Sequence, residues 1–326
     1  RLLRSLLLLV LSALLFSPTS QNNPSVLAQP AQPARVSPKL LAAYDKADTQ
    51  RVIVTFRTQT DLKAGAGDFA LDSMRGEVAG IQSQILASLP RGAFTVTSQY
   101  RVVPAMAGEL TAEGLRLLEA NPLVESINPD YMMHKAEVDA GADALMRHNT
   151  VHLLGARGAG INVAVIDTGI DMNHGNTELT GSVYFTRCTL GAWGGSDCPD
   201  EDDISNVTDG DSHGPHVAGI ISGRYGVAPD AGLAIFKALG DDGTGLQSEI
   251  IDAMDYIADN NGALGIHLIN MSLGSDERFN SELDCEDEMS AYADAVDAVI
   301  AAGPRIFAAT GNDGDLAGVS APACIP

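Results

Sequence analysis

Two short stretches of the chain place an aspartate and a histidine where they could share a proton. The stretch INVAVIDTGI (residues 161–170) has an apolar run without alternation, which is typical of a buried strand in a parallel sheet. This strand would end at Asp167, at the edge where the catalytic groups of open α/β sheets gather. The stretch DSHGPHVAGIISG (residues 211–223) predicts a helix that begins near His213, with Pro215 in its first turn. An aspartate at a strand end and a histidine at a helix start can meet, so the two predict two members of a Ser-His-Asp triad.

Two further motifs follow, INMSLG (residues 269–274) and AATGNDG (residues 308–314). Together with the Asp and His motifs they resemble the four motifs of subtilisin-like serine proteases, in that family's order. The resemblance implies that Asp167 orients His213, and that His213 acts as general base and then as general acid. It also implies that Asn312 donates its side-chain amide to the oxyanion of the reaction.

The same resemblance assigns three segments to substrate binding. Two of them would hold the substrate backbone as an added strand, and the third would line the primary specificity pocket. In chain order the strand-binding residues are Gly243, Thr244 and Gly245, then Ser272, Leu273 and Gly274, and the pocket residues are Ala309, Thr310 and Gly311. Two positions depart from the family's pattern, because Pro215 stands where Thr is usual and Thr310 where Ala is usual.

The family's nucleophile motif, Gly-Thr-Ser-Met-Ala, does not occur in the 326 residues. Ser272 is the nearest rival by motif, but in the family its position belongs to a substrate-binding strand. We therefore expect the nucleophilic serine further along a longer gene. Residues 1–326 alone are expected to be proteolytically inactive and unreactive toward a fluorophosphonate probe.

Other functions fit parts of these motifs. Asp-Thr-Gly also occurs in aspartic proteases, which need a second such loop, and this chain has none. His213 and His216 could bind zinc, but the chain shows no clear third ligand, so no metal residues are assigned. The alternatives from another class are a non-catalytic homologue that binds peptides in its cleft and a propeptide-type inhibitor. The sequence downstream of the last residue would decide between them and an enzyme.

The amino-terminal part of the chain has the pattern of an exported protein. Residues 1–28 predict a signal peptide, since Arg1 and Arg4 precede a short apolar run and Ala28 offers a cleavage position. An uncleaved anchor is the alternative. Residues 29–50 predict a Pro-rich linker. We expect the protein to be secreted, either extracellular or periplasmic, with no stable membrane insertion after signal cleavage.

Residues 51–135 predict a small α+β domain. Strands are expected at 51–57, 94–100, 103–110 and 124–131, with helices over 68–89 and from a Thr111 cap through Leu118, and this β-α-β-β-α-β order is ferredoxin-like. The domain resembles the propeptide of subtilisin-like enzymes. The resemblance implies an intramolecular inhibitor whose tail, residues 131–135, lies in the active-site cleft, with processing close to Lys135.

Residues 136–326 predict the subtilisin-like catalytic domain, incomplete at its carboxyl terminus. Strands and helices alternate, as in an α/β fold with a doubly wound parallel sheet. Further strands are expected at 233–239, 267–273 and 305–310, with helices over 250–257, capped by Ser248, and over 290–303.

Charge divides the chain near Lys135. Residues 1–135 hold 13 basic and 11 acidic residues, and residues 136–326 hold 7 basic and 31 acidic ones, so the stated net charge of −22 is +2 plus −24. Such an acidic surface disfavours binding to nucleic acid or to an anionic membrane. The expected partners are protein or peptide substrates and the protein's own propeptide, and the expected state is a monomer. Asp313 beside Asn312 further suggests tolerance of Lys or Arg directly before the scissile bond.

The four cysteines of an exported chain are expected to form disulfides. Cys188 with Cys198 and Cys285 with Cys324 is the simplest of three pairings, and zinc binding by all four is the alternative, although the chain has no C-x-x-C. The acidic stretch 197–211 could bind calcium or be a solvated loop. The family's calcium loop in the His helix has no counterpart here, so no cofactor is required and calcium stays open as a structural ion.

Overall fold

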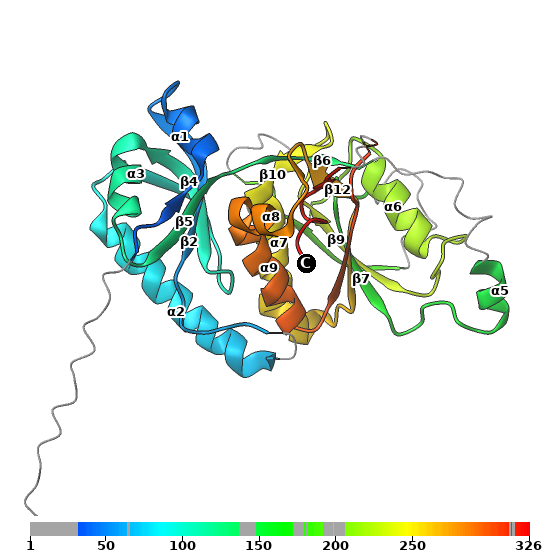
Figure 1. The fold of residues 1–326 in the computed structure, drawn as a ribbon. Helices are drawn as coiled ribbons and strands as arrows, with labels where there is room; N and C mark the ends of the chain where they lie inside the picture. Colours follow the sequence, from blue (N-terminus) through cyan, green and yellow to red (C-terminus); the bar gives the residue numbers. More distant parts are fainter. Residues whose placement is uncertain are drawn as a thin grey trace, which may run out of the picture. The chain divides into compact units, whose positions relative to one another are not determined.

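Two five-stranded sheets organise the structure, a computed structural model that describes residues 32–63, 66–136, 148–171, 179, 182–191, 198, 206–312, 314 and 317–326. The first sheet has the order β1-β5-β2-β4-β3, and the second has the order β14-β11-β7-β9-β8 (Figure 1). Residues 33–326 form one unit. The expected signal peptide, residues 1–28, lies outside the described residues.

The first sheet and its two helices contain the predicted β-α-β-β-α-β order. The elements are β2 (Thr49–Phe56), α2 (Gly67–Ser88), β3 (Phe94–Gln99), β4 (Ala105–Thr111), α3 (Ala112–Glu119) and β5 (Val124–Pro129). The central strand β2 is antiparallel to both of its neighbours, β4 and β5. Thr111 caps α3 as expected, because its hydroxyl accepts the Gly114 N–H at 3.1 Å.

A short strand and a helix precede this set, where a linker over residues 29–50 was expected. β1 (Arg35–Val36) pairs in parallel with β5, and α1 (Pro38–Tyr44) follows it. Pro38 stands at the start of the helix, where its missing N–H costs no hydrogen bond, and Leu40 is buried. One of the prolines that predicted a linker, Pro38, is therefore the first residue of a helix.

The second sheet confirms the predicted doubly wound parallel sheet. Its strands are β7 (Asn162–Asp167), β8 (Val183–Cys188), β9 (Gly232–Lys237), β11 (Leu268–Met271) and β14 (Arg305–Ala308), and every pairing between them is parallel. The edge strand β8 was not predicted, because its sequence VYFTRC mixes polar and apolar residues without a clear period.

Helices cover both faces of this parallel sheet, as Figure 1 shows. Val163 and Val165 of β7 pack in one apolar cluster with residues of α6 (His213–Ser222). Ala164 and Ile166, which point the other way, pack in a second cluster with residues of α7 (Gln247–Leu264) and α9 (Ser290–Ala301). Burial on both faces explains the uninterrupted apolar run in the sequence of β7.

The start of α7 differs from the prediction that Ser248 caps it. Ser248 lies inside the helix, where its N–H and hydroxyl donate to the two carboxylate oxygens of Asp130 at 3.0 and 2.8 Å. Glu249 closes the helix start by accepting the Leu246 N–H at 2.8 Å. A carboxylate that follows β5 thus satisfies an amide at the beginning of α7.

A second carboxylate of α7 binds the loop between β3 and β4. Asp255 accepts the backbone N–H groups of Arg101, Val102 and Val103 at 2.8, 2.7 and 2.9 Å. The hydroxyl of the buried Tyr100 donates to the Ser248 carbonyl at 3.1 Å. The first half of the chain is therefore joined to α7 by buried polar contacts.

The remaining described elements connect the two sheets and the chain end. They are β6 (Met132–Lys135), α5 (His148–Leu153), β10 (Thr244–Leu246), β12 (Leu273–Ser275), β13 (Arg278–Phe279), α8 (Glu282–Glu288) and β15 (Val319–Ser320). Disulfides join Cys188 to Cys198 and Cys285 to Cys324, each with Cα atoms 6.1 Å apart, which is the local pairing. None of the helices in the described ranges has the length and apolar character needed to span a bilayer.

Candidate active site

Asp167 and His213 lie in direct contact at the carboxyl edge of the parallel sheet. Asp167 is the last residue of β7, is fully buried, and its Oδ1 lies 2.7 Å from Nδ1 of His213, the first residue of α6. The same oxygen accepts the Thr168 N–H at 2.7 Å. Asp167 therefore fixes Nδ1 of His213 as the protonated nitrogen, because a carboxylate can only accept there.

Two glycines allow the helix start to approach the strand end. A Cβ at Gly214 would lie 2.1 Å from the Gly169 carbonyl oxygen, and one at Gly169 would lie 2.3 Å from the Val207 carbonyl oxygen. Ser212, directly before His213, has a φ of 81°, and no other non-glycine residue of the described chain has a positive φ. The loop before α6 is thus held in an uncommon conformation, which aims His213 at Asp167.

The segments expected to bind a substrate strand hold a strand of the chain itself. β6 lies between β10 and β12 and is antiparallel to both, with His134 opposite Thr244 on one side and Gly274 on the other. The Lys135 N–H donates to the Gly243 carbonyl at 2.9 Å. The Ala136 N–H donates to the Ser272 carbonyl at 2.7 Å. β6 is therefore the middle strand of a three-stranded antiparallel sheet, paired with both segments that the sequence assigned to substrate binding.

The carbonyl oxygen of Ala136 lies against the outer nitrogen of His213. The distance between this oxygen and Nε2 is 2.5 Å, so both ring nitrogens face oxygen atoms that can only accept. Such a contact needs a proton on each nitrogen, which is the charged imidazolium. Burial lowers the pKa of His213, but the hydrogen bond and charge of Asp167, with the hydrogen bond to Ala136, outweigh it and the pKa is raised.

The other predicted site residues follow the strand ends of the sheet. Asn312 is exposed in the loop after β14, and within the described part of the chain no hydrogen bond joins it to Asp167 or His213. Ala309 donates its N–H to the Met271 carbonyl at 3.0 Å, which places the predicted pocket segment beside β11. Arg278 donates to the Thr310 carbonyl at 3.0 Å, and its guanidinium packs against Gly311, whose φ is +99°. Asp313 lies outside the described residues.

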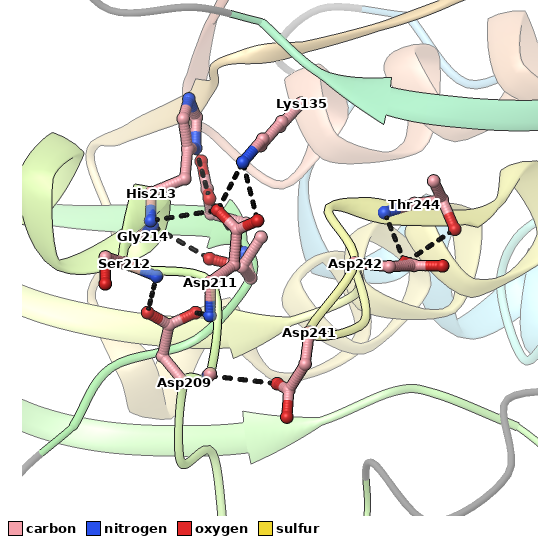
Figure 2. A network of polar contacts seen from close by, with 12 residues as sticks. Lys135, Asp209, Asp211, Ser212, His213, Gly214, Asp241, Asp242 and Thr244 are labelled. Carbon is pink, nitrogen blue, oxygen red and sulfur yellow. Dashed lines mark hydrogen bonds and ion pairs between the residues drawn. The ribbon is translucent and has the colours of Figure 1, made fainter.

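Sequence reasoning missed the contact between the Asp211 carboxylate and Lys135, a residue of β6. Both carboxylate oxygens of Asp211 contact Lys135 Nζ, at 2.7 and 2.5 Å, as Figure 2 shows. Asp211 stands two residues before His213, and this spacing was the available signal. The sequence could not show that Lys135 contacts Asp211, because that contact depends on the register of β6 between β10 and β12.

No group of three or more His, Cys, Asp or Glu side chains suited to a metal ion occurs among the described residues. The calcium hypothesis concerned residues 197–211, and most of its residues before 206 lie outside the described ranges.

A parallel α/β sheet with an aspartate at a strand end bonded to a histidine at a helix start is the arrangement in which the subtilisin type of α/β fold holds two members of its triad. Comparison with known proteins agrees, because residues 158–326 match the model of the subtilase family. The chain belongs to the subtilase family.

Several subtilases of bacilli are similar to this chain. Subtilisin E of Bacillus subtilis (strain 168) is 31% identical over 232 residues, which are 69% of this chain and 54% of that protein. The alkaline protease of Alkalihalobacillus alcalophilus is 30% identical over 228 residues, 66% of this chain and 51% of that protein. Alkaline elastase YaB of Bacillus sp. (strain YaB) is 28% identical over 251 residues, 72% of this chain and 58% of that protein. The chain thus spans slightly more than half the length of these relatives.

Proposed function

We propose that the protein is the precursor of a secreted serine endopeptidase that hydrolyses peptide bonds through an acyl-enzyme. The observation that carries the proposal is the position of Ala136. Its carbonyl oxygen contacts His213 Nε2 while residues 132–135 pair with β10 and β12, and this supports a peptide substrate that lies in the same place.

In this proposal, His213, Asp167 and Asn312 each carry out a different part of the reaction. His213 takes the proton of the nucleophile and later gives it to the leaving amine, and Asp167 stabilises the imidazolium between these steps. Asn312 donates its side-chain amide to the oxyanion, a role whose loss in subtilisin, a relative of this protein, lowers turnover by about 10²–10³. The nucleophile is a serine that the family's motif supplies, and that motif is not among the 326 residues.

The first sheet, with its helices, acts as an inhibitory propeptide in this proposal. Asp130, Asp255 and Tyr100 support it by joining that half to α7. Because the Ala136 carbonyl oxygen contacts His213, the proposal puts the processed bond directly after Ala136, one residue beyond the boundary expected from the sequence. The mature enzyme therefore begins at Glu137 and acts on protein or peptide substrates, as a monomer that needs no cofactor, with calcium open as a structural ion.

Amino-terminal sequencing of the secreted protein, in a form that contains the serine nucleophile, tests this proposal. We expect Glu137 as the first residue of the mature form, and no processing in a His213→Ala variant. A mature form that began near Gln29, or a His213→Ala variant that was processed at the same bond, would contradict it. A peptide-binding homologue without catalysis, the alternative, would remain unprocessed in both forms.

A further inference from the structure

The register of β6 assigns each of its residues a position relative to the scissile bond. Because the Ala136 carbonyl faces His213, Ala136 is the residue directly before that bond, the P1 residue. Lys135 is then P2, His134 is P3 and Met133 is P4. Lys135 is thus the second residue before the bond. The preference for lysine or arginine that Asp313 suggested concerned the first residue before the bond, so the two preferences are different.

Asp211 is built to receive the P2 side chain. Its side chain is 9% exposed and that of Lys135 is 37% exposed, so this ion pair is partly shielded from water. Asp211 Oδ1 also accepts the His213 N–H at 3.2 Å. Asp209 holds the same loop, because its two carboxylate oxygens accept the N–H groups of Asp211 at 3.3 Å and of Ser212 at 2.5 Å (Figure 2). These hydrogen bonds within the loop hold the Asp211 carboxylate beside Lys135.

Gly243 provides room for the aliphatic part of the lysine. A Cβ at Gly243 would lie 2.7, 2.9 and 3.1 Å from Cδ, Cε and Cγ of Lys135. Any larger residue would press on the side chain that reaches Asp211. The φ of Gly243 is +76°, a conformation that favours glycine by itself, so this position adds close packing against the lysine stem and no charge.

Further acidic residues lie near the Lys135 side chain, and a buried lysine beside them, Lys237, is already paired. Asp241 and Asp242 lie on the loop before β10, as Figure 2 shows, and Asp276 lies 3.0 Å from His134 Nε2. Lys237 is fully buried and donates to the Thr168 carbonyl at 2.7 Å and to Asp241 at 2.8 Å. Lys237 therefore offsets Asp241, while Asp211 faces the P2 side chain.

We propose that Asp211 selects lysine or arginine at P2, so that the substrates are peptides with a basic residue one position away from a small P1 residue. The small P1 and an apolar P4 follow from the bound strand, where Ala136 is 6% exposed and Met133 is fully buried. The inference rests on the proposed function, because it names the substrate class of that site.

Four peptides that share the sequence Tyr-Met-Met-His-Xaa-Ala-Glu-Val, with Lys, Arg, Gln or Glu at Xaa, test the proposal on a form of the protein that contains the serine nucleophile. We expect kcat/KM for the Lys and Arg peptides to exceed that for the Gln peptide by about tenfold or more, with Glu the poorest. In Asp211→Asn the ratio of Lys to Gln should fall to about one, and Asp211→Lys should favour Glu.

Asp276→Asn is the matched control, because Asp276 faces the P3 residue. It should leave the ratio of Lys to Gln at P2 as in the wild type. A wild-type ratio near one, or a ratio that Asp211→Asn does not change, would overturn the proposal.

A second measurement does not depend on hydrolysis. In the chain of 326 residues, Lys135→Gln and Asp211→Asn should each lower the melting temperature, and the double variant should lose no more than the larger single loss. If no form of the protein cleaves any of the peptides, the proposed function fails. The double-mutant cycle of Lys135→Gln and Asp211→Asn then tests by itself whether Asp211 recognises lysine. Non-additive losses then support recognition of lysine by Asp211, and additive losses overturn it.

Discussion

At the scale of single residues, the site depends on the close approach of α6 to the end of β7 and on the proton at His213 Nε2. The contact between His213 Nε2 and the Ala136 carbonyl oxygen requires the imidazolium, since Nδ1 already donates to Asp167. A raised pKa of His213 means that this contact is fully present below the ordinary histidine pKa. It is lost as pH rises through the raised value, because the proton on Nε2 is then removed.

Asp167→Asn should therefore lower the pKa of His213. The amide oxygen of the new residue can still accept from Nδ1, but the negative charge that stabilises the imidazolium is gone. The midpoint of the His213 ring-proton shift, followed by NMR against pH, measures this. Equal His213 midpoints in the two proteins would speak against the role given to Asp167.

Gly214→Ala should destabilise the protein by about 1–3 kcal/mol, because its Cβ would lie 2.1 Å from the Gly169 carbonyl oxygen and the backbone must shift. Gly219→Ala in the same helix is the matched control, since no atom lies within 4 Å of a Cβ there and alanine favours the helix by up to about 1 kcal/mol. Urea unfolding of both variants gives the two changes. A Gly214→Ala protein as stable as Gly219→Ala would show that the approach of α6 to β7 is not tight.

At the scale of elements, α7 joins the two halves of the chain through buried carboxyl groups. Burial raises the pKa of Asp130 to about 7, although the hydrogen bonds from Ser248 favour its charged form. Burial likewise raises the pKa of Asp255 to about 6, against the three backbone N–H groups that it accepts. A carboxyl group with a raised pKa binds more protons in the folded than in the unfolded protein. The free energy of unfolding therefore falls as pH rises from the ordinary carboxyl pKa to the raised one.

Because the pKa of Asp130 is raised, we expect the free energy of unfolding to decline between about pH 4 and about pH 7. Asp130→Asn should flatten this decline, because a neutral amide can accept the Ser248 N–H and donate to its hydroxyl at every pH. Urea unfolding at half-unit pH steps compares the two proteins. The prediction fails if their curves against pH are parallel.

At the scale of the whole molecule, basic residues of the weakly charged half meet acidic residues of the strongly acidic half. Arg75 and Arg101 pair with the buried carboxylate of Asp259, Arg35 pairs with Asp287, and Lys39 pairs with Glu277. Lys135 with Asp211 continues the pattern into the cleft. The net charges of +2 and −24 on the two sides of Lys135 are therefore complementary across this contact.

Arg75→Gln should cost more stability in low salt than in high salt. Asp259 is only 5% exposed, so loss of Arg75 leaves this poorly solvated charge with Arg101, a single and more exposed arginine partner. Salt at 1 M NaCl shortens the screening length to about 3 Å and weakens the attraction that is lost. Urea midpoints at 0.05 and 1 M NaCl measure the difference. Arg91→Gln, at an exposed position before β3, is the control and should change little at either salt concentration. An Arg75→Gln loss that is the same in both salts would exclude an electrostatic origin.

The sequence by itself determined the features that are local in the chain. Asp167 follows an apolar run buried on both faces, His213 begins a helix, and Thr111 caps α3, and each is specified by residues within one turn or strand. The parallel sheet and the family follow from such motifs and their order. Linker composition was less informative, because Pro38, one of the prolines in the stretch expected to be a linker, starts α1.

Only the tertiary structure decided which residues meet across long separations. Ala136 lies opposite His213, Asp211 receives Lys135, and Asp130 replaces the expected Ser248 cap, although 77, 76 and 118 positions separate these pairs. A shift of β6 by one residue would present the other face of the strand to the cleft and move every contact. That register is set by the packing of one half of the chain on the other, which no local pattern encodes.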